Sequence, residues 1–286
     1  MKKKSPLKVY GVLGYPVKHS FSPAMHNAGF SARKIKAVYK LFEVKPSELE
    51  SFVSSLKANY IRGFNVTIPY KEKILDYING RLSAAARVIG AVNTVLVDPS
   101  GKLSGLNTDF LGFAQHITEL RLKPRKVALL GAGGAARAVC YALAKKHVEE
   151  IAIYDIDKFR SIALAERFQG AFPATNFITA AGIEDLKVPA KDLLINASPV
   201  GMKPDDPCLF SPRMLHRKLF VYDLIYNPAR TKLLELAKDH GLEVANGLKM
   251  LLYQAVVPFE KWTGKQAPLE LMHQALKKEL ERCREQ

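Results

Sequence analysis

The segment VALLGAGGAARA, residues 127–138, decides the fold of this chain. Its apolar start predicts a buried parallel strand, its glycines predict a tight turn, and the helix-forming residues that follow predict a helix. Gly131 permits the turn, Gly133 has no side chain to keep the backbone away from a pyrophosphate, and Ala136 takes a packing position. The N-terminus of the helix would offer free N–H groups to an anion. We therefore expect a dinucleotide phosphate site here.

A second strand, residues 151–155, supports this interpretation because it ends in a carboxylate. Asp155 lies 24 residues after Gly131. An acid about 20 residues beyond such a turn is expected to hydrogen-bond the adenosine ribose hydroxyls. A glycine turn before a buried helix can also be purely structural, so it is the acid at this spacing that favours a dinucleotide.

Strand and helix patterns alternate regularly from residue 124 to about residue 245. Strands are expected near 126–131, 150–155, 192–196, 219–224 and 242–245, and helices near 134–146, 159–169 and 229–239. This alternation predicts a doubly wound, Rossmann-type α/β domain. The small polar residues after the third strand, Ser198 among them, would leave room for a nicotinamide ring. The alternative is simply a strand followed by a loop.

The first 110 residues and the last 40 contain further elements. Strands are expected near 8–14, 38–44, 63–68, 91–97 and 102–106, and helices near 22–34, 47–57, 81–88, 110–120, 248–263 and 268–284. Ser22 before Pro23 is interpreted as a helix N-cap, and Ser47 with Glu50 as a capping box. Residues 98–101 are expected to turn one strand into the next as a hairpin.

Polar side chains gather at the strand ends and first helical turns of this N-terminal region. They are Asn65, Thr67, Lys71, Asn93, Asn107 and Asp109. Ligands of open α/β sheets usually bind at the carboxyl ends of strands, so a polar pocket is expected there. Capping and turn chemistry would explain any one of these residues alone. Ser20 has no evident structural role in its loop, and Gln254 is either a buried core amide or a ligand contact.

The composition is that of a globular protein with a basic surface. The chain has 286 residues, 24% of them charged, and a formal net charge of +16. The basic residues are spread along the chain and form no nucleic-acid-binding motif, so we expect a solvated surface and no nucleic-acid partner. No apolar run is long enough for a membrane span, and no signal core follows the basic N-terminus. Three widely spaced cysteines form neither a disulfide nor a metal pattern, so a cytoplasmic protein without a metal is expected.

Eight motifs resemble those of the shikimate dehydrogenase family, in the same order and over nearly the whole chain. They lie at 14–27, 65–71, 90–94, 105–109, 131–137, 196–202, 223–228 and 246–255. The resemblance implies an α/β protein of two domains. Residues 1–110 and 247–286 would form a substrate-binding catalytic domain whose mixed sheet is completed by the C-terminal helices, and residues 111–246 a Rossmann dinucleotide domain.

The resemblance also implies an activity, namely reversible hydride transfer between a nicotinamide dinucleotide and shikimate or 3-dehydroshikimate, in aromatic amino acid biosynthesis. The implied substrate-binding residues are Ser20, Ser22, Thr67, Lys71, Asn93, Asp109, Tyr226 and Gln254, the two serines holding the carboxylate. The implied cofactor-binding residues are Gly131, Gly133, Gly134, Ala135, Asp155, Asp157, Arg160, Ser198, Met202 and Gly247. Lys71 and Asp109 would be the catalytic pair, Lys71 as the acid/base for the hydroxyl proton and Asp109 as the group that orients it.

One departure from the family pattern concerns the cofactor. Members that prefer NADP carry Asn-Arg-Thr after the second strand, where this chain has Asp155, Ile156 and Asp157. The arginine that clamps the 2′-phosphate is absent, and two carboxylates would repel that phosphate. We therefore expect NAD to be preferred, although Lys158 and Arg160 could still support partial NADP use. NAD preference resembles the quinate/shikimate dehydrogenase branch, so an NAD-dependent enzyme of quinate catabolism stays an alternative.

Two other functions compete with this one. A methylene-tetrahydrofolate dehydrogenase would share the two-domain dinucleotide architecture, but the Ser20/Ser22 and 107–109 motifs argue against it. A non-catalytic sensor of NAD and a cyclic hydroxy acid would need neither Lys71 nor Asp109, and no appended DNA-binding segment is seen. Monomer and homodimer both stay open, because no heptad pattern decides between them.

Overall fold

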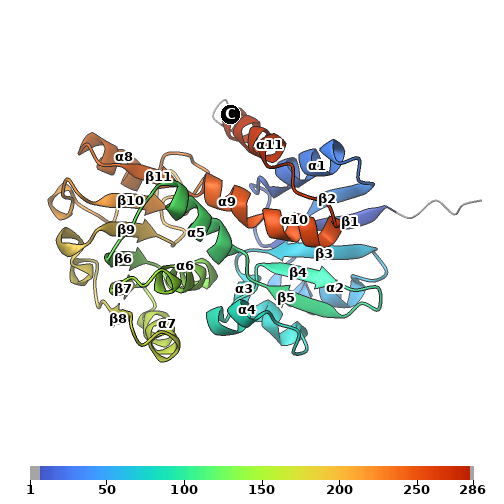
Figure 1. Cartoon of the computed structure of the whole chain (residues 1–286), viewed down its shortest axis with the longest axis horizontal. Helices are drawn as coiled ribbons and strands as arrows, with labels where there is room; N and C mark the ends of the chain where they lie inside the picture. Colours follow the sequence, from blue (N-terminus) through green and yellow to red (C-terminus); the bar gives the residue numbers. More distant parts are fainter. Residues whose placement is uncertain (1–6, 284–286) are drawn as a thin grey trace, which may run out of the picture. The chain divides into compact units, whose positions relative to one another are not determined.

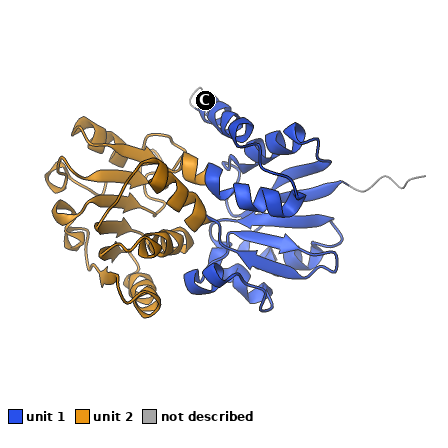
Figure 2. Cartoon of the chain, viewed as in Figure 1, with its two compact units in different colours: residues 1–108, 252–286 blue, residues 109–251 orange. Residues whose placement is uncertain are grey.

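The computed structural model describes residues 7–283. The chain divides into two compact units, coloured separately in Figure 2. Unit 1 comprises residues 1–108 and 252–286, and unit 2 comprises residues 109–251. The domain boundaries expected from the sequence lay after residue 110 and before residue 247. Each unit has its own sheet, and both are α/β, as predicted.

Unit 1 is built on a mixed five-stranded sheet of order β2-β1-β3-β4-β5. Its strands are β1 (Lys8–Gly14), β2 (Ala37–Glu43), β3 (Ile61–Val66), β4 (Thr94–Val97) and β5 (Leu103–Leu106). β1 runs parallel to β2 and β3, whereas β4 is antiparallel to β3 and β5. The predicted hairpin therefore forms between β4 and β5.

Helices cover the sheet of unit 1 with residues from both ends of the chain. They are α1 (Ser22–Ala32), α2 (Leu49–Ser55), α3 (Tyr70–Lys73), α4 (Ala84–Ile89), α10 (Val256–Thr263) and α11 (Leu269–Arg282), with a 3-10 turn at Ile74–Tyr77. The rings of Tyr10 and Trp262 stack at 5.1 Å, and those of Phe30 and Phe259 at 5.5 Å. The C-terminal helices thus complete the core of the N-terminal sheet, as the family resemblance implied.

Two helix starts in unit 1 differ from the prediction. The N-cap of α1 is Phe21, and Ser22 is already helical. Its N–H donates to Ser20 Oγ at 3.3 Å, so Ser20 has the structural role that was not evident from the sequence. The helix near residue 47 begins with a 3-10 turn, Pro46–Glu48, in which the Glu48 carboxylate accepts from Lys45 N at 3.1 Å. The expected box of Ser47 and Glu50 is wrong, because proline starts the helix earlier.

The helix expected at 248–263 is two helices, α9 (Leu248–Gln254) and α10, which meet at Ala255. Pro258 explains the break. It has no N–H to donate to the carbonyl of Gln254, and its ring excludes that carbonyl from the helical position.

Unit 2 is built on a parallel six-stranded sheet of order β11-β10-β9-β6-β7-β8. Its strands are β6 (Lys126–Leu130), β7 (Glu150–Tyr154), β8 (Asn176–Thr179), β9 (Leu193–Asn196), β10 (Phe220–Asp223) and β11 (Val244–Asn246). Numbered in chain order, this is the 3-2-1-4-5-6 order of the Rossmann fold, which confirms the predicted fold class. The edge strand β8 was not predicted, because only one of its four residues is buried.

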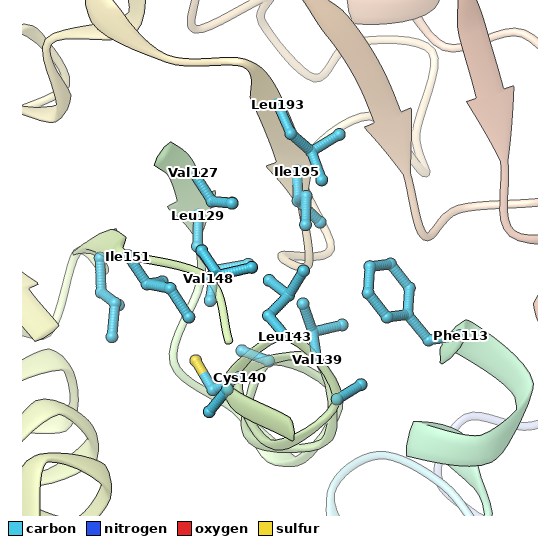
Figure 3. Packing of buried hydrophobic residues seen from close by; sticks show 14 of the residues in the cluster. Phe113, Val127, Leu129, Val139, Cys140, Leu143, Val148, Ile151, Leu193 and Ile195 are labelled. Atoms are coloured by element: carbon cyan, nitrogen blue, oxygen red, sulfur yellow. The ribbon is translucent and has the colours of Figure 1, made fainter. Parts of the chain in front are cut away.

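Helices cover both faces of this sheet, which explains why nearly all residues of β6 are apolar. The helices of unit 2, labelled in Figure 1, are α5 (Asp109–Glu119), α6 (Gly134–Lys145), α7 (Lys158–Ala171) and α8 (Lys232–Asp239). Val127 and Leu129 share a core with α5, α6 and α7, whereas Ala128 and Leu130 face a second core that includes α8. In Figure 3, Val139 and Leu143 of α6 lie among the side chains of that first core. Within residues 7–283, no helix is both long and apolar enough to cross a membrane.

Candidate active site

The glycine turn of unit 2 connects β6 to α6 and needs glycine at its first position. Gly131 has a φ of +100°, and a Cβ there would lie 3.0 Å from the carbonyl group of Ala197. Both the backbone conformation and the lack of space therefore exclude other residues. Gly133 is the N-cap of the twelve-residue helix α6, and Gly134 and Ala135 form its first turn. The N–H groups of this turn are placed to bind an anion.

The carboxylate of Asp155 joins the end of β7 to the glycine turn. Its Oδ2 accepts a hydrogen bond from Ala132 N at 2.7 Å, and its Oδ1 accepts from Asp157 N at 3.0 Å. Each carboxylate oxygen can accept more than one hydrogen bond, so ribose hydroxyls can still be bound. Asp157 is exposed and caps α7 by accepting from Phe159 N at 3.0 Å. The sequence did not reveal that this carboxylate has a structural role as well.

Arg160 lies close to the glycine turn. A Cβ built on Gly133 would be 3.4 Å from a terminal guanidinium nitrogen of Arg160. Beside it, Ile156 is 95% exposed and Phe159 is 72% exposed. The carboxyl end of β7 therefore presents acidic, cationic and apolar side chains together, the mixture of groups that a ribose, a phosphate and a purine ring need.

The other predicted cofactor residues lie in the loops that follow β9 and β11, and the predicted substrate residue Tyr226 lies in the loop that follows β10. Ser198 and Met202 are half-buried in the loop after β9, and Tyr226 is half-buried in the loop after β10. Gly247 lies between β11 and α9, where a Cβ would be 2.0 Å from the carbonyl oxygen of Leu224. No side chain can replace this glycine without moving the backbone.

A buried carboxylate, Asp223, lies beneath these loops and was not among the predicted site residues. Thr231 Oγ1 donates to it at 2.6 Å, Ile225 N at 3.0 Å and Asn196 Nδ2 at 3.1 Å. Burial raises the pKa of Asp223 to about 6, against the opposing effect of these hydrogen bonds. The signal that could have found it is an aspartate that ends an otherwise apolar central strand.

In unit 1 a buried polar network joins residues that are far apart in the chain. Asn93 Nδ2 donates to Gln254 Oε1 at 3.2 Å, and Thr108 N donates to Asn93 Oδ1 at 2.7 Å. All three side chains are buried. The structure thus brings the predicted residues Asn93 and Gln254 together and gives the buried Gln254 amide a hydrogen-bond partner from a distant part of the chain.

The network extends through Asn65, one of the polar residues expected in the pocket, and through Tyr39 and Thr94, which were not predicted. Tyr39 Oη donates to Asn65 Oδ1 at 2.7 Å, Asn65 Nδ2 donates to Thr94 Oγ1 at 3.0 Å, and Thr94 Oγ1 donates to Asn93 Oδ1 at 3.1 Å. Asn93 is therefore held from several sides. A fixed amide of this kind can present its remaining polar atoms to a ligand with little loss of entropy.

Ser20, Ser22 and Thr67 follow two strands that are neighbours in the sheet. Leu13 of β1 pairs with Val66 of β3, and Thr67 N donates to Leu13 O at 2.8 Å. Ser22 is buried, whereas Ser20 and Thr67 are half-buried. The segments that carry these hydroxyls thus leave the sheet of unit 1 from adjacent strands.

Lys71 and Asp109 belong to different units. Lys71 is half-buried in α3, and its carbonyl accepts from Val92 N at 2.7 Å, which anchors it to the residue before Asn93. Asp109 is buried, opens α5 and directly follows Thr108 of the network. Among the described residues, no three His, Cys, Asp or Glu side chains are grouped to hold a metal ion.

Comparison with known proteins gives the family. Residues 12–95 match the shikimate dehydrogenase substrate binding domain, and residues 247–277 match the shikimate 5′-dehydrogenase C-terminal domain. A shikimate dehydrogenase (NADP(+)) of Caldanaerobacter subterraneus is 41% identical over 284 residues, which cover 98% of this chain and 100% of that protein. The chain belongs to the shikimate dehydrogenase family.

Solved structures with the same fold include two with NAD bound. The shikimate 5-dehydrogenase of Listeria monocytogenes, in complex with shikimate and NAD, has a TM-score of 0.83 and 35% identity and covers 96% of this chain and 98% of its own. The quinate dehydrogenase of Corynebacterium glutamicum, in complex with NAD, has a TM-score of 0.84 and 32% identity. The match covers 95% of this chain and 99% of that protein. The predicted family is confirmed, and with it the enzyme class, an oxidoreductase that acts on a secondary alcohol with a nicotinamide dinucleotide.

Proposed function

We propose that this chain is a shikimate dehydrogenase that oxidises the ring hydroxyl of shikimate reversibly to the ketone of 3-dehydroshikimate and prefers NAD to NADP. The observation that carries the proposal is the buried network of Asn93, Thr108 and Gln254. Thr108 of this network directly precedes Asp109, and Val92, the residue before Asn93, donates its N–H to Lys71 O, in a chain that belongs to this family.

Unit 1 supplies the groups that recognise the substrate. The hydroxyls of Ser20 and Ser22 bind its carboxylate, and Thr67, Asn93 and Gln254 bind its ring hydroxyls. Recognition by fixed polar groups excludes analogues that lack the matching hydroxyls, because the buried amides would then lose a partner. Asn93 and Gln254 are suited to this role because they are already held in place by each other and by the surrounding network.

Lys71 and Asp109 perform the proton chemistry. When bound, the nicotinamide would supply the hydride acceptor for the carbinol carbon. Lys71 Nζ takes the proton from the hydroxyl as the ketone forms, and in the reverse direction it returns that proton to the oxygen. Asp109 orients the ammonium group and the reacting hydroxyl.

Unit 2 fits a dinucleotide. The turn at Gly131 has no space for a side chain, and α6 presents its N-terminus at that turn. These groups would hold the pyrophosphate, and the Asp155 carboxylate would hold the adenosine ribose. Tyr226 and Gly247 belong to the loops expected at the nicotinamide.

The preference for NAD follows from Asp155 and Asp157. Both carboxylates are fixed by backbone N–H groups at the end of β7, so neither can easily turn away from a 2′-phosphate. Two fixed carboxylates would repel a 2′-phosphate and disfavour NADP, while the Arg160 cation beside Gly133 opposes that effect. We expect NAD to be favoured roughly tenfold to a hundredfold in kcat/KM.

Quinate is the second candidate substrate. The solved quinate dehydrogenase with NAD shares the fold and 32% of the sequence. Quinate carries an additional hydroxyl on the carboxylate-bearing carbon, so the segment with Ser20 and Ser22 would have to admit it.

A matrix of four initial-rate assays tests the proposal. Shikimate and quinate are each oxidised with NAD and with NADP, and the formation of the reduced cofactor is followed by absorbance. The expected result is the highest kcat/KM for shikimate with NAD. A higher kcat/KM with NADP than with NAD would overturn the cofactor preference. A higher kcat/KM with quinate than with shikimate would make quinate the preferred substrate. Binding of NAD and shikimate without turnover would favour the sensor function instead.

A further inference from the structure

Three adjacent strands of unit 2 end in a polar residue at the same register. Asp223, the last residue of β10, pairs with Asn196 of β9 on one side and with Asn246 of β11 on the other. Each side-chain oxygen accepts a hydrogen bond from the N–H two residues further along the chain. The donors are Ser198, Ile225 and Leu248, at 3.0, 3.0 and 3.1 Å. Each strand end thus shapes the loop that follows it.

Asp223 connects two of these loops. It is 0% exposed, and it accepts from Asn196 on its β9 side and from Thr231 at the start of α8. Thr231 in turn accepts from Leu234 N at 3.4 Å and caps α8. A buried carboxylate is costly unless all its hydrogen bonds are made, so this residue fixes the arrangement of its partners.

Asn196 passes this constraint to the loop that carries Ser198 and Met202. Its Nδ2 also donates to Val200 O at 2.9 Å. Gly201 has a φ of +107°, and a Cβ there would lie 3.4 Å from Thr231. The loop after β9 is therefore held by Asn196 and lies against the Asp223 partner Thr231.

The third loop is attached to the second. Gly247 N donates to Ile225 O at 3.2 Å, and Asn246 Nδ2 donates to Ala229 O at 3.0 Å. All three loops that carry the proposed nicotinamide-side residues are thus linked to the end of β10.

We propose that Asp223 is a positioning residue for the nicotinamide half of the cofactor site. Through Asn196 and Thr231 it holds the loops of Ser198, Met202, Tyr226 and Gly247 in one arrangement. The inference rests on the proposed function. The adenosine and pyrophosphate groups are assigned to the ends of β6 and β7 instead, so Asp223 should affect the two halves of the cofactor unequally.

The test compares Asp223→Asn with the wild-type enzyme in three measurements. These are kcat for shikimate with NAD, the fluorescence gain of NADH on binding, and the inhibition constant of ADP-ribose, which lacks the nicotinamide. A displacement of about 1 Å at the reacting ring costs roughly a hundredfold in rate, so kcat should fall between about tenfold and a hundredfold. The fluorescence gain should fall as well, whereas the inhibition constant of ADP-ribose should stay within about twofold.

Thr231 provides a second test that does not depend on the folding of the Asp223 variant. Thr231→Val removes the hydroxyl that donates to Asp223 and should lower kcat, and Thr231→Ser should restore most of that loss. Thr175→Val is the matched control. Thr175 is equally buried, and its hydroxyl donates to Val148 O at 2.8 Å on the β8 side of the sheet. This variant should lose stability without a selective loss of kcat.

Each result decides the question. An Asp223→Asn enzyme with normal kcat and normal NADH fluorescence, but with a lower melting temperature, would show a purely structural role and overturn the proposal. A rise in the inhibition constant of ADP-ribose as large as the loss of NADH binding would overturn it too. If the wild-type chain binds NADH but oxidises neither shikimate nor quinate, the proposed function fails, and the fluorescence measurements still decide the role of Asp223. If the wild-type chain does not bind NADH, both proposals fail.

Discussion

The side-chain amide of Asn93 donates a hydrogen bond to Gln254 at 3.2 Å, although the two residues are 161 positions apart. This contact joins the segment before β4 to the end of α9. It places the last part of the chain in unit 1, with the N-terminal sheet. The proposed substrate site therefore needs both ends of the chain to be folded.

Replacement of Gln254 tests the substrate side of the proposal. Gln254→Leu should raise KM for shikimate by roughly tenfold to a hundredfold, because it removes a ligand contact and leaves the Asn93 amide without one partner. The dissociation constant of NAD should stay the same. Gln274→Leu, on the exposed face of α11, is the control. A normal KM in the Gln254 variant would assign this amide to structure alone.

Replacement of Lys71 tests the acid/base role. Lys71→Ala should lower kcat by about a hundredfold to ten-thousandfold, the usual contribution of a positioned proton-transfer group. NAD affinity, measured by calorimetry, should change little. Lys73→Ala changes an exposed lysine of the same short helix and should leave kcat near the wild-type value. Near-normal turnover of Lys71→Ala would refute the assignment.

Replacement of the residues after β7 tests the cofactor preference. The triple variant Asp155→Asn, Ile156→Arg and Asp157→Thr should shift the ratio of kcat/KM from NAD towards NADP by at least about tenfold, because it removes two negative charges and adds a cation. Asp185→Asn is the control, since Asp185 also holds a turn, by accepting from Gly182 N, but in another loop of unit 2. An unchanged ratio would show that Arg160 and the backbone determine the preference.

Acid should destabilise the fold through two buried histidines. Burial lowers the pKa of His26 to about 3 and that of His116 to about 4. The unfolded chain binds these protons at about pH 6.5 and the folded chain does not, so stability is full above that pH and is lost as the pH falls. His26→Phe should remove roughly 2 kcal/mol of the loss between pH 6.5 and about 4.5. The free energy of unfolding, measured in urea at both pH values, checks this.

The packing of His26 supports the choice of phenylalanine. Its ring is 0% exposed and stacks on Tyr39 at 4.3 Å with an interplanar angle of 3°. Neither ring nitrogen has a hydrogen-bond partner within the described part of the chain. His19→Gln, at an exposed position, is the control. The prediction fails if His26→Phe keeps the acid sensitivity of the wild type.

Local pattern was enough to predict the helices and five of the six strands of unit 2. Apolar strands follow amphipathic helices in turn along this part of the chain, and both patterns arise from burial. The strands β6, β7, β9, β10 and β11 were therefore predicted close to their observed positions. β8 was missed because a short edge strand with one buried residue has no such pattern. The prediction of a single helix at 248–263 was wrong, because the apolar residues keep their helical spacing through the break that Pro258 imposes.

The chemistry of the glycine turn could also be read from local sequence, since the turn, the helix N-terminus and the acid at the end of β7 are close along the chain. The sequence by itself determined the two α/β folds and the residue types available for binding, because burial and turn geometry depend on near neighbours. Only the tertiary structure decided which polar groups meet. The Asn93–Gln254 bond and the pairing of Asp223 with Asn196 and Thr231 join separate strands and helices, and hydrogen bonds between such segments depend on register and packing, which no local pattern encodes.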